Sequence, residues 1–296
     1  MTVVAAAPRK PSGGLAALAP LMGVFLLSLM AVGAILFYVR AKIVAAHPDV
    51  ELVIPLSIEG VQAFEKSLQQ LAGSKFEIGA AVCAVYIFLQ AFSIPGSFVM
   101  NLLSGVVFGS AVGVPLLAVL TTVGSMLCYA LSWSFGKPLL EQLGLMDKLS
   151  AFRNRIRRAD SEGTLFFYLM TVRAFPMSPH WFLNLASPWV GVSPLNFAPT
   201  ILIGKMPYVW AIVTAGELVS QLRPGASIIT WQDQLKLAGL ALLLSAPALL
   251  MRLCSKKKVA SPWEIIFGDD ADAAADAGAP AAEGAAEADA GKPKAE

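Results

Sequence analysis

Long apolar stretches separated by short charged segments dominate the pattern of hydrophobic and polar positions along this chain. The longest, residues 78–136, contains no Asp, Glu, Lys or Arg over 59 consecutive positions. At about 1.5 Å per residue, a continuous helix of that length would measure roughly 90 Å, whereas the hydrocarbon core of a bilayer is about 30 Å thick. The stretch is therefore expected to fold back on itself inside a membrane.

Proline-containing segments mark the places where two apolar stretches break. One is the SIPGS segment at 93–97, and the other is the RAFPMSPH segment at 173–180. Proline removes a backbone donor and glycine loosens the chain, so a helix ends at each segment. We expect each break to form the tip of a re-entrant hairpin, which enters and leaves the membrane on the same side. The residues that create the breaks are Pro95, Gly96, Pro176 and Pro179.

The fold class predicted from this pattern is an all-α polytopic membrane protein. It has about four full transmembrane helices plus two re-entrant, proline-broken hairpins. The predicted regions are a disordered N-terminus (1–14), a first transmembrane helix (15–39), a non-cytoplasmic loop with an amphipathic helix (40–75), a core with both hairpins (76–222), a last transmembrane helix (235–253) and a disordered acidic tail (259–296). Within the core, full spans are expected at 112–135 and 194–216.

The basic segments predict the orientation of the chain. Arginine and lysine gather before the first span, in a loop at 137–162, and after the last span at 252–258. By the positive-inside rule all three segments, and hence both termini, are expected to be cytoplasmic. Arg40 and Lys42 then lie on the opposite side, as an exception to the rule.

Composition agrees with a lipid environment and disfavours an enzyme. Hydrophobic residues make up 56% of the chain and charged residues 14%, against about 45–50% and about 25% in soluble proteins. The two histidines, His47 and His180, are far apart in the sequence, so no histidine-rich metal site is expected. No P-loop, nucleophile with its base or nucleic-acid-binding pattern is present. The sequence predicts no enzymatic activity and no cofactor.

The two proline-broken segments also resemble each other. Ala-Phe, eight residues, Asn-Leu, one residue and Ser occur in this order at 91–104 and again at 174–187, at a constant offset of 83. The predicted topology sends the two copies into the membrane from opposite faces. This arrangement is typical of an inverted repeat whose broken helices meet near the midplane.

Motifs around both hairpins carry a family resemblance. The first set comprises FxIPGS at 92–97, LSG at 103–105 and GSxxxYxLSxxxGKP at 124–138. It resembles the VTT domain of the DedA superfamily. The second, RxxPxxPxWFxNxxSP at 173–188, looks more specifically like the eukaryotic stasimon branch. The likeness covers about residues 76–222.

This resemblance implies a protein of the endoplasmic reticulum that moves phospholipids between leaflets without energy input. Such a scramblase would support autophagosome formation and lipid mobilisation, with membrane phospholipids and autophagy proteins as its partners. Bacterial relatives that resemble proton-coupled carriers tend to have acidic residues in the first hairpin, and this chain has none there. The resemblance therefore favours uncoupled transport.

Four polar residues in the apolar core are candidates for a headgroup path: Arg173, Asn101, Asn184 and Lys205. A buried guanidinium matches a phosphate bidentately, and unpaired backbone groups at the helix breaks would line a hydrated groove. Each residue also has a structural alternative. Arg173 can cap backbone carbonyls, the two asparagines can join helices by hydrogen bonds, and Lys205, which departs from the apolar residue expected from the resemblance, can snorkel to the interface.

Two other functions remain open at this point. A proton- or ion-coupled transporter of lipid or a small solute would need a titratable or ion-binding group. A membrane assembly or tethering factor would use the basic loop at 153–158 or the acidic tail.

Overall fold

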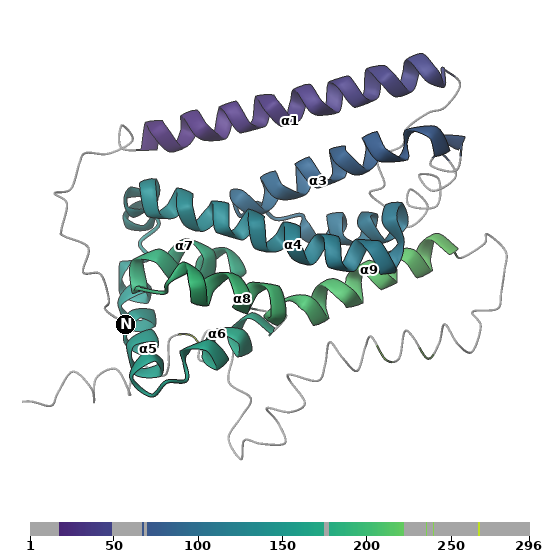
Figure 1. Ribbon diagram of the computed structural model, residues 1–296. Helices are drawn as coiled ribbons and strands as arrows, with labels where there is room; N and C mark the ends of the chain where they lie inside the picture. The colour runs from purple at the N-terminus through teal and green to yellow at the C-terminus, as the bar shows by residue number, and fades with distance from the viewer. Residues whose placement is uncertain are drawn as a thin grey trace, which may run out of the picture.

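The computed structural model describes residues 18–48, 67, 70–174, 178–221, 235, 239 and 266. Within these residues all regular secondary structure is helical, which confirms the all-α prediction. The helices are α1 (Ala19–Ala46), the short 3-10 helix η2 (Ala72–Ser74), α3 (Lys75–Ala91), α4 (Ser97–Gln142), α5 (Met146–Ser161), α6 (Leu165–Ala174), α7 (His180–Val190), α8 (Pro194–Gly204) and α9 (Met206–Gln221). Figure 1 shows α1, α3, α4 and α9 running lengthwise, with α5 across one end.

Three segments are long and apolar enough to cross a membrane: α1, α4 and the α8–α9 segment, residues 194–220. They correspond to three of the four expected spans. The fourth, 235–253, lies outside the continuously described residues, as do the amphipathic helix expected after residue 60 and the acidic tail. The structure thus supports an integral membrane protein.

Helix α1 is longer than the span predicted to end at residue 39, because it continues to Ala46. Its surface is lined with exposed leucine, methionine and phenylalanine side chains, as suits a helix surrounded by lipid. The extension puts Lys42 on its last turns, where the ammonium group forms an ion pair with Glu77 of α3. Glu77 thus neutralises the charge of Lys42, one of the two basic residues that are exceptions to the predicted orientation.

The first break has the backbone conformation that its sequence predicts. Helix α3 ends at Ala91, Ser93 has φ 51° and Gly96 has φ 135°, and α4 begins at Ser97. Positive φ is readily adopted by glycine but is uncommon for a serine. The chain therefore leaves α3 through a tight turn and starts a new helix within five residues.

A second break divides α4 at Gly109, where φ is 68° and ψ is 171°. It lies between the first expected hairpin and the full span expected at 112–135. A Cβ atom on Gly113 would lie 3.2 Å from the carbonyl oxygen of Ser104. In a straight helix residues nine apart are separated by about 13 Å. The chain therefore reverses at Gly109, so that residues 97–108 lie beside the start of the long segment 110–142.

Glycines bring the reversed segment into direct contact with α9. A Cβ on Gly105 would lie 2.0 Å from the carbonyl oxygen of Val213, and a Cβ on Gly216 would lie 2.0 Å from that of Leu102. Only glycine permits so close an approach of two backbones. This crossing fixes the first half of the core against the last described helix.

The second half contains three further breaks. Helix α6 ends at Ala174 and α7 begins at His180, and residues 175–177, including Pro176, lie outside the described residues. Gly191 ends α7 in the left-handed conformation with φ 92°. The span expected to be continuous from residue 194 is divided at Lys205 into α8 and α9.

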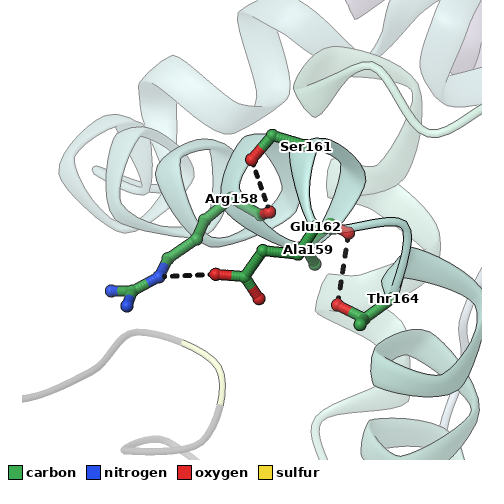
Figure 2. A network of polar contacts seen from close by, with 5 residues as sticks. All are labelled: Arg158, Ala159, Ser161, Glu162 and Thr164. Atoms are coloured by element: carbon green, nitrogen blue, oxygen red, sulfur yellow. Dashed lines mark hydrogen bonds and ion pairs between the residues drawn. The ribbon is translucent and has the colours of Figure 1, made fainter.

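The basic segment expected to be a loop contains the amphipathic helix α5. Leu149, Phe152 and Ile156 on one face are buried, whereas Arg157 and Arg158 on the other are exposed. Polar contacts define the end of the helix, as Figure 2 shows: Arg158 binds Glu162, the Ser161 hydroxyl donates to the Arg158 carbonyl, and the Thr164 hydroxyl donates to the Ala159 carbonyl. The basic segment thus forms a helix, because apolar residues recur here at helical spacing.

Candidate functional site

Arg173 is the most deeply buried cation of the described core, with 2% of its surface exposed. It lies in the last turn of α6, immediately before the second break. Its Nη1 donates a hydrogen bond to Oδ1 of Asn184 over 3.2 Å, and its guanidinium carbon lies 4.5 Å from the centre of the Phe197 ring. Two helices therefore hold the guanidinium in place, α7 through Asn184 and α8 through Phe197.

Asn184 connects this arginine to the long segment of α4. Its Oδ1 accepts from Arg173, and its Nδ2 donates to the hydroxyl of Ser125 over 3.2 Å. Asn184 is 3% exposed and Ser125 1% exposed. The structure thus brings two of the predicted candidates, Arg173 and Asn184, into direct contact, and adds a serine from the first half of the core.

Arg173 keeps two buried donors free. Neither Nε nor Nη2 has a hydrogen-bond partner among the described residues. These two nitrogens lie on the same edge of the guanidinium, and their N–H bonds run nearly parallel. That edge is the one that binds two oxygens of a carboxylate or phosphate.

Lys205 is buried beside Arg173. It occupies the break between α8 and α9, with 7% of its surface exposed. The preceding Gly204 packs against α6, so closely that a Cβ there would lie 3.1 Å from Cβ of Arg173. The positive charges of the lysine and the arginine interact electrostatically. Neither cation forms an ion pair with any described residue.

His180 belongs to the same group. It begins α7 directly after the second break, and its ring interacts electrostatically with Lys205 and Arg173. Its Nδ1 is buried and has no partner among the described residues. We call the two cations Arg173 and Lys205, together with the neighbouring His180 ring, the cation cluster.

Asn101 is not joined to the cation cluster. It is 1% exposed in the reversed segment of α4, and its Oδ1 has no hydrogen-bond partner among the described residues. The two asparagines occupy equivalent places in the repeated motif, yet only Asn184 bonds to a cation. A shared role for the pair in one binding site is therefore not supported by the observed contacts.

A cavity lies between residues that are close to the two helix breaks. Its volume is about 190 Å³, and it is bounded by Ala91, Phe92 and Ser93 at the first break and by Trp181 and Leu185 just after the second. Pro95 and Gly96 complete the first turn, and Pro179 directly precedes α7. The two breaks are thus brought to one place in the fold.

A row of small polar side chains runs along α4 from the cation cluster to this cavity. We call Thr121, Ser125, Cys128 and Ser132 the polar stripe. Their spacing of four, three and four residues keeps them on one helix face. All four are buried. From Thr121 to Ser132, a distance of eleven residue steps, the stripe covers about 16 Å, roughly half of a hydrocarbon core.

The members of the polar stripe contact α3, the first break and α7. Thr121 bonds to the hydroxyl of Tyr86 in α3 over 2.6 Å, and Ser125 accepts from Asn184. Cys128 lies 3.2 Å from the Ser93 hydroxyl at the first break. Ser132 accepts from the indole of Trp189 over 3.0 Å, and both Cys128 and Ser132 line the cavity.

Several residues of this site were not predicted as candidates. Ser125 and Ser132 belong to the sequence motif that carries the family resemblance, which was the only signal for them. Phe197 has no sequence signal, since its place under Arg173 depends on how α8 packs. Within the described residues no group of three or more histidine, cysteine or acidic side chains is placed to hold a metal ion.

Comparison with known proteins places the site in a recognised domain. Residues 94–218, which contain Pro95 and Gly96 of the first break, the second break and the cation cluster, match the VTT domain. The chain is 34% identical over 200 residues to a transmembrane protein 41 homolog of Dictyostelium discoideum, an alignment covering 67% of this chain and 59% of that protein.

Two further relatives have similar names. Transmembrane protein 41B of Xenopus laevis is 28% identical over 208 residues, covering 70% of this chain and 74% of the relative. A transmembrane protein 41 homolog of Caenorhabditis elegans is 27% identical over 243 residues, covering 82% and 96%. No solved structure matches the chain.

Proposed function

Because the chain belongs to the VTT-domain family, in the branch of the transmembrane protein 41 homologues, we propose that it is an energy-independent phospholipid scramblase. The observation that carries this proposal is the polar stripe, which connects a buried cation cluster to a cavity between two helix breaks. A headgroup crossing a bilayer needs such a polar path, since each unsatisfied polar group in hydrocarbon costs several kcal/mol.

The proposed path is built by an inverted repeat of two re-entrant hairpins. Ala91 and Ala174 end the entering helices, and Ser97 and His180 begin the returning ones, so both pairs of positions are 83 apart. In each half a glycine with positive φ, Gly109 or Gly191, follows the returning arm. Equal helix boundaries in both halves support the repeat detected in the sequence.

In this mechanism the headgroup moves along the polar stripe while the acyl chains remain in lipid. Arg173 and Lys205 attract the phosphate, and the hydroxyls of Thr121, Ser125 and Ser132 supply exchangeable hydrogen bonds. These hydroxyls are now occupied by partners on other helices. The path therefore opens when α3 or α7 moves slightly away from α4. No ATP or ion gradient enters this mechanism.

A proton-coupled transporter is the second candidate, favoured by one carboxylate. Glu217 of α9 accepts a hydrogen bond from the backbone N–H of Ser110, 2.9 Å away, at the Gly109 break. The sequence of the first hairpin has no acidic residue, but the fold brings one to its end. A coupled carrier requires an acidic or ion-binding residue inside the membrane, and Glu217 is the acidic residue at this place.

A scramblase assay separates the two functions. Purified protein is reconstituted in liposomes with fluorescent phospholipid in both leaflets, and an impermeant quencher is added outside without ATP or an ion gradient. Scrambling makes fluorescence fall well below the half that protein-free liposomes retain, and Arg173→Ala slows the fall. Signal loss that stops at half, with reconstitution verified, contradicts the scramblase. Transport that appears only with a pH gradient, and is lost in Glu217→Gln, supports the coupled carrier.

The cellular setting is also part of the proposal. The family resemblance supports a location in the endoplasmic reticulum and a role in autophagosome formation and lipid mobilisation. The basic segments support cytoplasmic termini. Fluorescence microscopy with an endoplasmic reticulum marker tests the organelle, and protease protection of terminal tags tests the orientation.

A further inference from the structure

The cation cluster carries two positive charges that no described acidic residue neutralises. Arg173 is 2% exposed and Lys205 is 7% exposed, and neither forms an ion pair with a described residue. Buried charges are costly unless they are paired, and they are especially costly in a membrane. Among the described residues, the two positive charges of Arg173 and Lys205 therefore have no acidic partner, and a bound anion could neutralise them.

The free donors indicate which kind of anion fits. Nη1 of Arg173 is held by Asn184, and the face of the guanidinium rests on Phe197, so the remaining edge with Nε and Nη2 has a fixed direction. This edge matches two oxygens of one tetrahedral phosphate. The Nδ1 atom of His180 and the Lys205 ammonium group add two more polar groups close to the same charge.

We propose that the cation cluster of Arg173, His180 and Lys205 selects a phosphate headgroup with two negative charges, a phosphomonoester lipid such as phosphatidic acid. This inference rests on the proposed lipid transport and names its preferred substrate class. A phosphomonoester has a charge of about −1.5 to −2 at neutral pH. A phosphodiester such as phosphatidylglycerol has a net charge of minus one, and zwitterionic phosphatidylcholine has a net charge of zero. Affinity therefore decreases in this order.

A binding experiment in detergent tests the preference without requiring transport. The full-length protein in an uncharged detergent is titrated separately with the dioctanoyl forms of phosphatidic acid, phosphatidylglycerol and phosphatidylcholine, and with inorganic phosphate. Ligand-induced shifts of the unfolding temperature give the four affinities. We expect phosphatidic acid to bind at least about 10-fold more tightly than phosphatidylcholine, with phosphatidylglycerol between them.

Variants connect the preference to the cluster. Lys205→Met removes one charge and is expected to reduce the ratio between phosphatidic acid and phosphatidylcholine several-fold. Arg173→Lys keeps the charge but loses the two-donor edge, so it weakens phosphatidic acid binding by about 10-fold. Arg157→Gln removes an exposed charge on α5 and serves as the matched control. It should bind all four ligands as the natural protein does.

Equal affinity for phosphatidic acid and phosphatidylcholine would overturn the inference. Inorganic phosphate binding as tightly as phosphatidic acid would also overturn it, because the site would then serve a free anion. An undiminished preference in Lys205→Met would show that the cluster is not responsible. If the preference is found but the liposome assay shows no scrambling, the binding site stands and the transport function fails. Scrambling without any preference gives the opposite result.

Discussion

The carboxylate of Glu217 accepts a hydrogen bond from the backbone N–H of Ser110, although 107 positions separate the two residues. Ser110 follows the positive-φ Gly109 that reverses α4, and it opens the long segment that carries the polar stripe. The first backbone N–H groups of a helix have no intrahelical acceptor. Glu217 supplies one from α9, and so ties the end of the core to its first reversal.

Removing this acceptor is expected to destabilise the fold. Glu217→Ala leaves the N–H of Ser110 without a partner, and hydrogen bonds to charged groups contribute about 1.5–3 kcal/mol. Glu217→Gln keeps one carbonyl oxygen and should lose less. Thermal unfolding in detergent measures both, with Glu141→Gln as a control at an exposed carboxylate. Equal stability of Glu217→Ala and the natural protein would show that the bond does not stabilise the turn.

The close crossing of α4 and α9 predicts a strong intolerance to side chains. Gly105→Ala places a methyl group 2.0 Å from the Val213 carbonyl oxygen and 2.8 Å from the Glu217 nitrogen. Both atoms belong to the backbone, so the helices have to separate, and overpacking of this kind costs about 1–3 kcal/mol or more. A lower unfolding temperature and reduced yield are the expected results.

Gly33→Ala is the matched control for this substitution. Gly33 lies in the middle of α1, with no atom within 4 Å of an added Cβ. Alanine favours a helix over glycine by up to about 1 kcal/mol. The control should therefore unfold at the same or a slightly higher temperature. A similar loss in both variants would mean that the effect comes from glycine replacement in general and not from the crossing.

The hydrophobic pattern predicted most helices because it depends on local chemistry. Proline and glycine at Pro95 and Gly96 stop a helix wherever it packs, so the first break was readable. A second break between the first hairpin and the span at 112–135 was expected from length alone, but the sequence did not identify Gly109 as its residue, since a lone glycine inside an apolar run is compatible with a straight helix. Its reversal is held by Glu217 from a distant part of the chain. The break at Lys205 was missed although Gly204 and Pro207 flank it, because the apolar run continues on both sides.

The candidate site was predictable residue by residue but not as a set of contacts. Arg173, Asn184 and Lys205 stand out as polar residues in apolar surroundings. Their mutual placement depends on how α6 packs on α8 through Gly204 and how α7 turns after the break. The repeat predicts equivalent roles for Asn101 and Asn184. Among the described residues, however, only Asn184 forms a hydrogen bond with a cation.

The cavity between the two breaks offers a direct test of the proposed path. Leu131 lines it together with Ser93 and Trp181. Leu131→Trp adds a large ring to a space of about 190 Å³ and should slow scrambling while the protein stays folded. Val123→Trp, at an exposed position of the same helix, is the control. If both variants scramble at the natural rate, the cavity is not on the lipid path.

Asn184 allows a distinction between a structural hydrogen bond and a site that binds an anion. Asn184→Asp places a carboxylate of nearly the same shape 3.2 Å from the Arg173 guanidinium. The new ion pair preserves the link between α6 and α7 and keeps an acceptor for a Ser125 hydroxyl. If the asparagine only joins helices, unfolding temperature and scrambling should both remain close to natural values. If Arg173 binds lipid phosphate, the aspartate competes with it, because the cation is already neutralised. We therefore expect a stable protein whose scrambling rate falls by about 10-fold or more, as the loss of a charge-assisted hydrogen bond implies.

Asn184→Ala, which removes both hydrogen bonds of the asparagine, should lose stability as well as scrambling activity. The aspartate variant alone therefore separates the structural role of Asn184 from anion binding by Arg173.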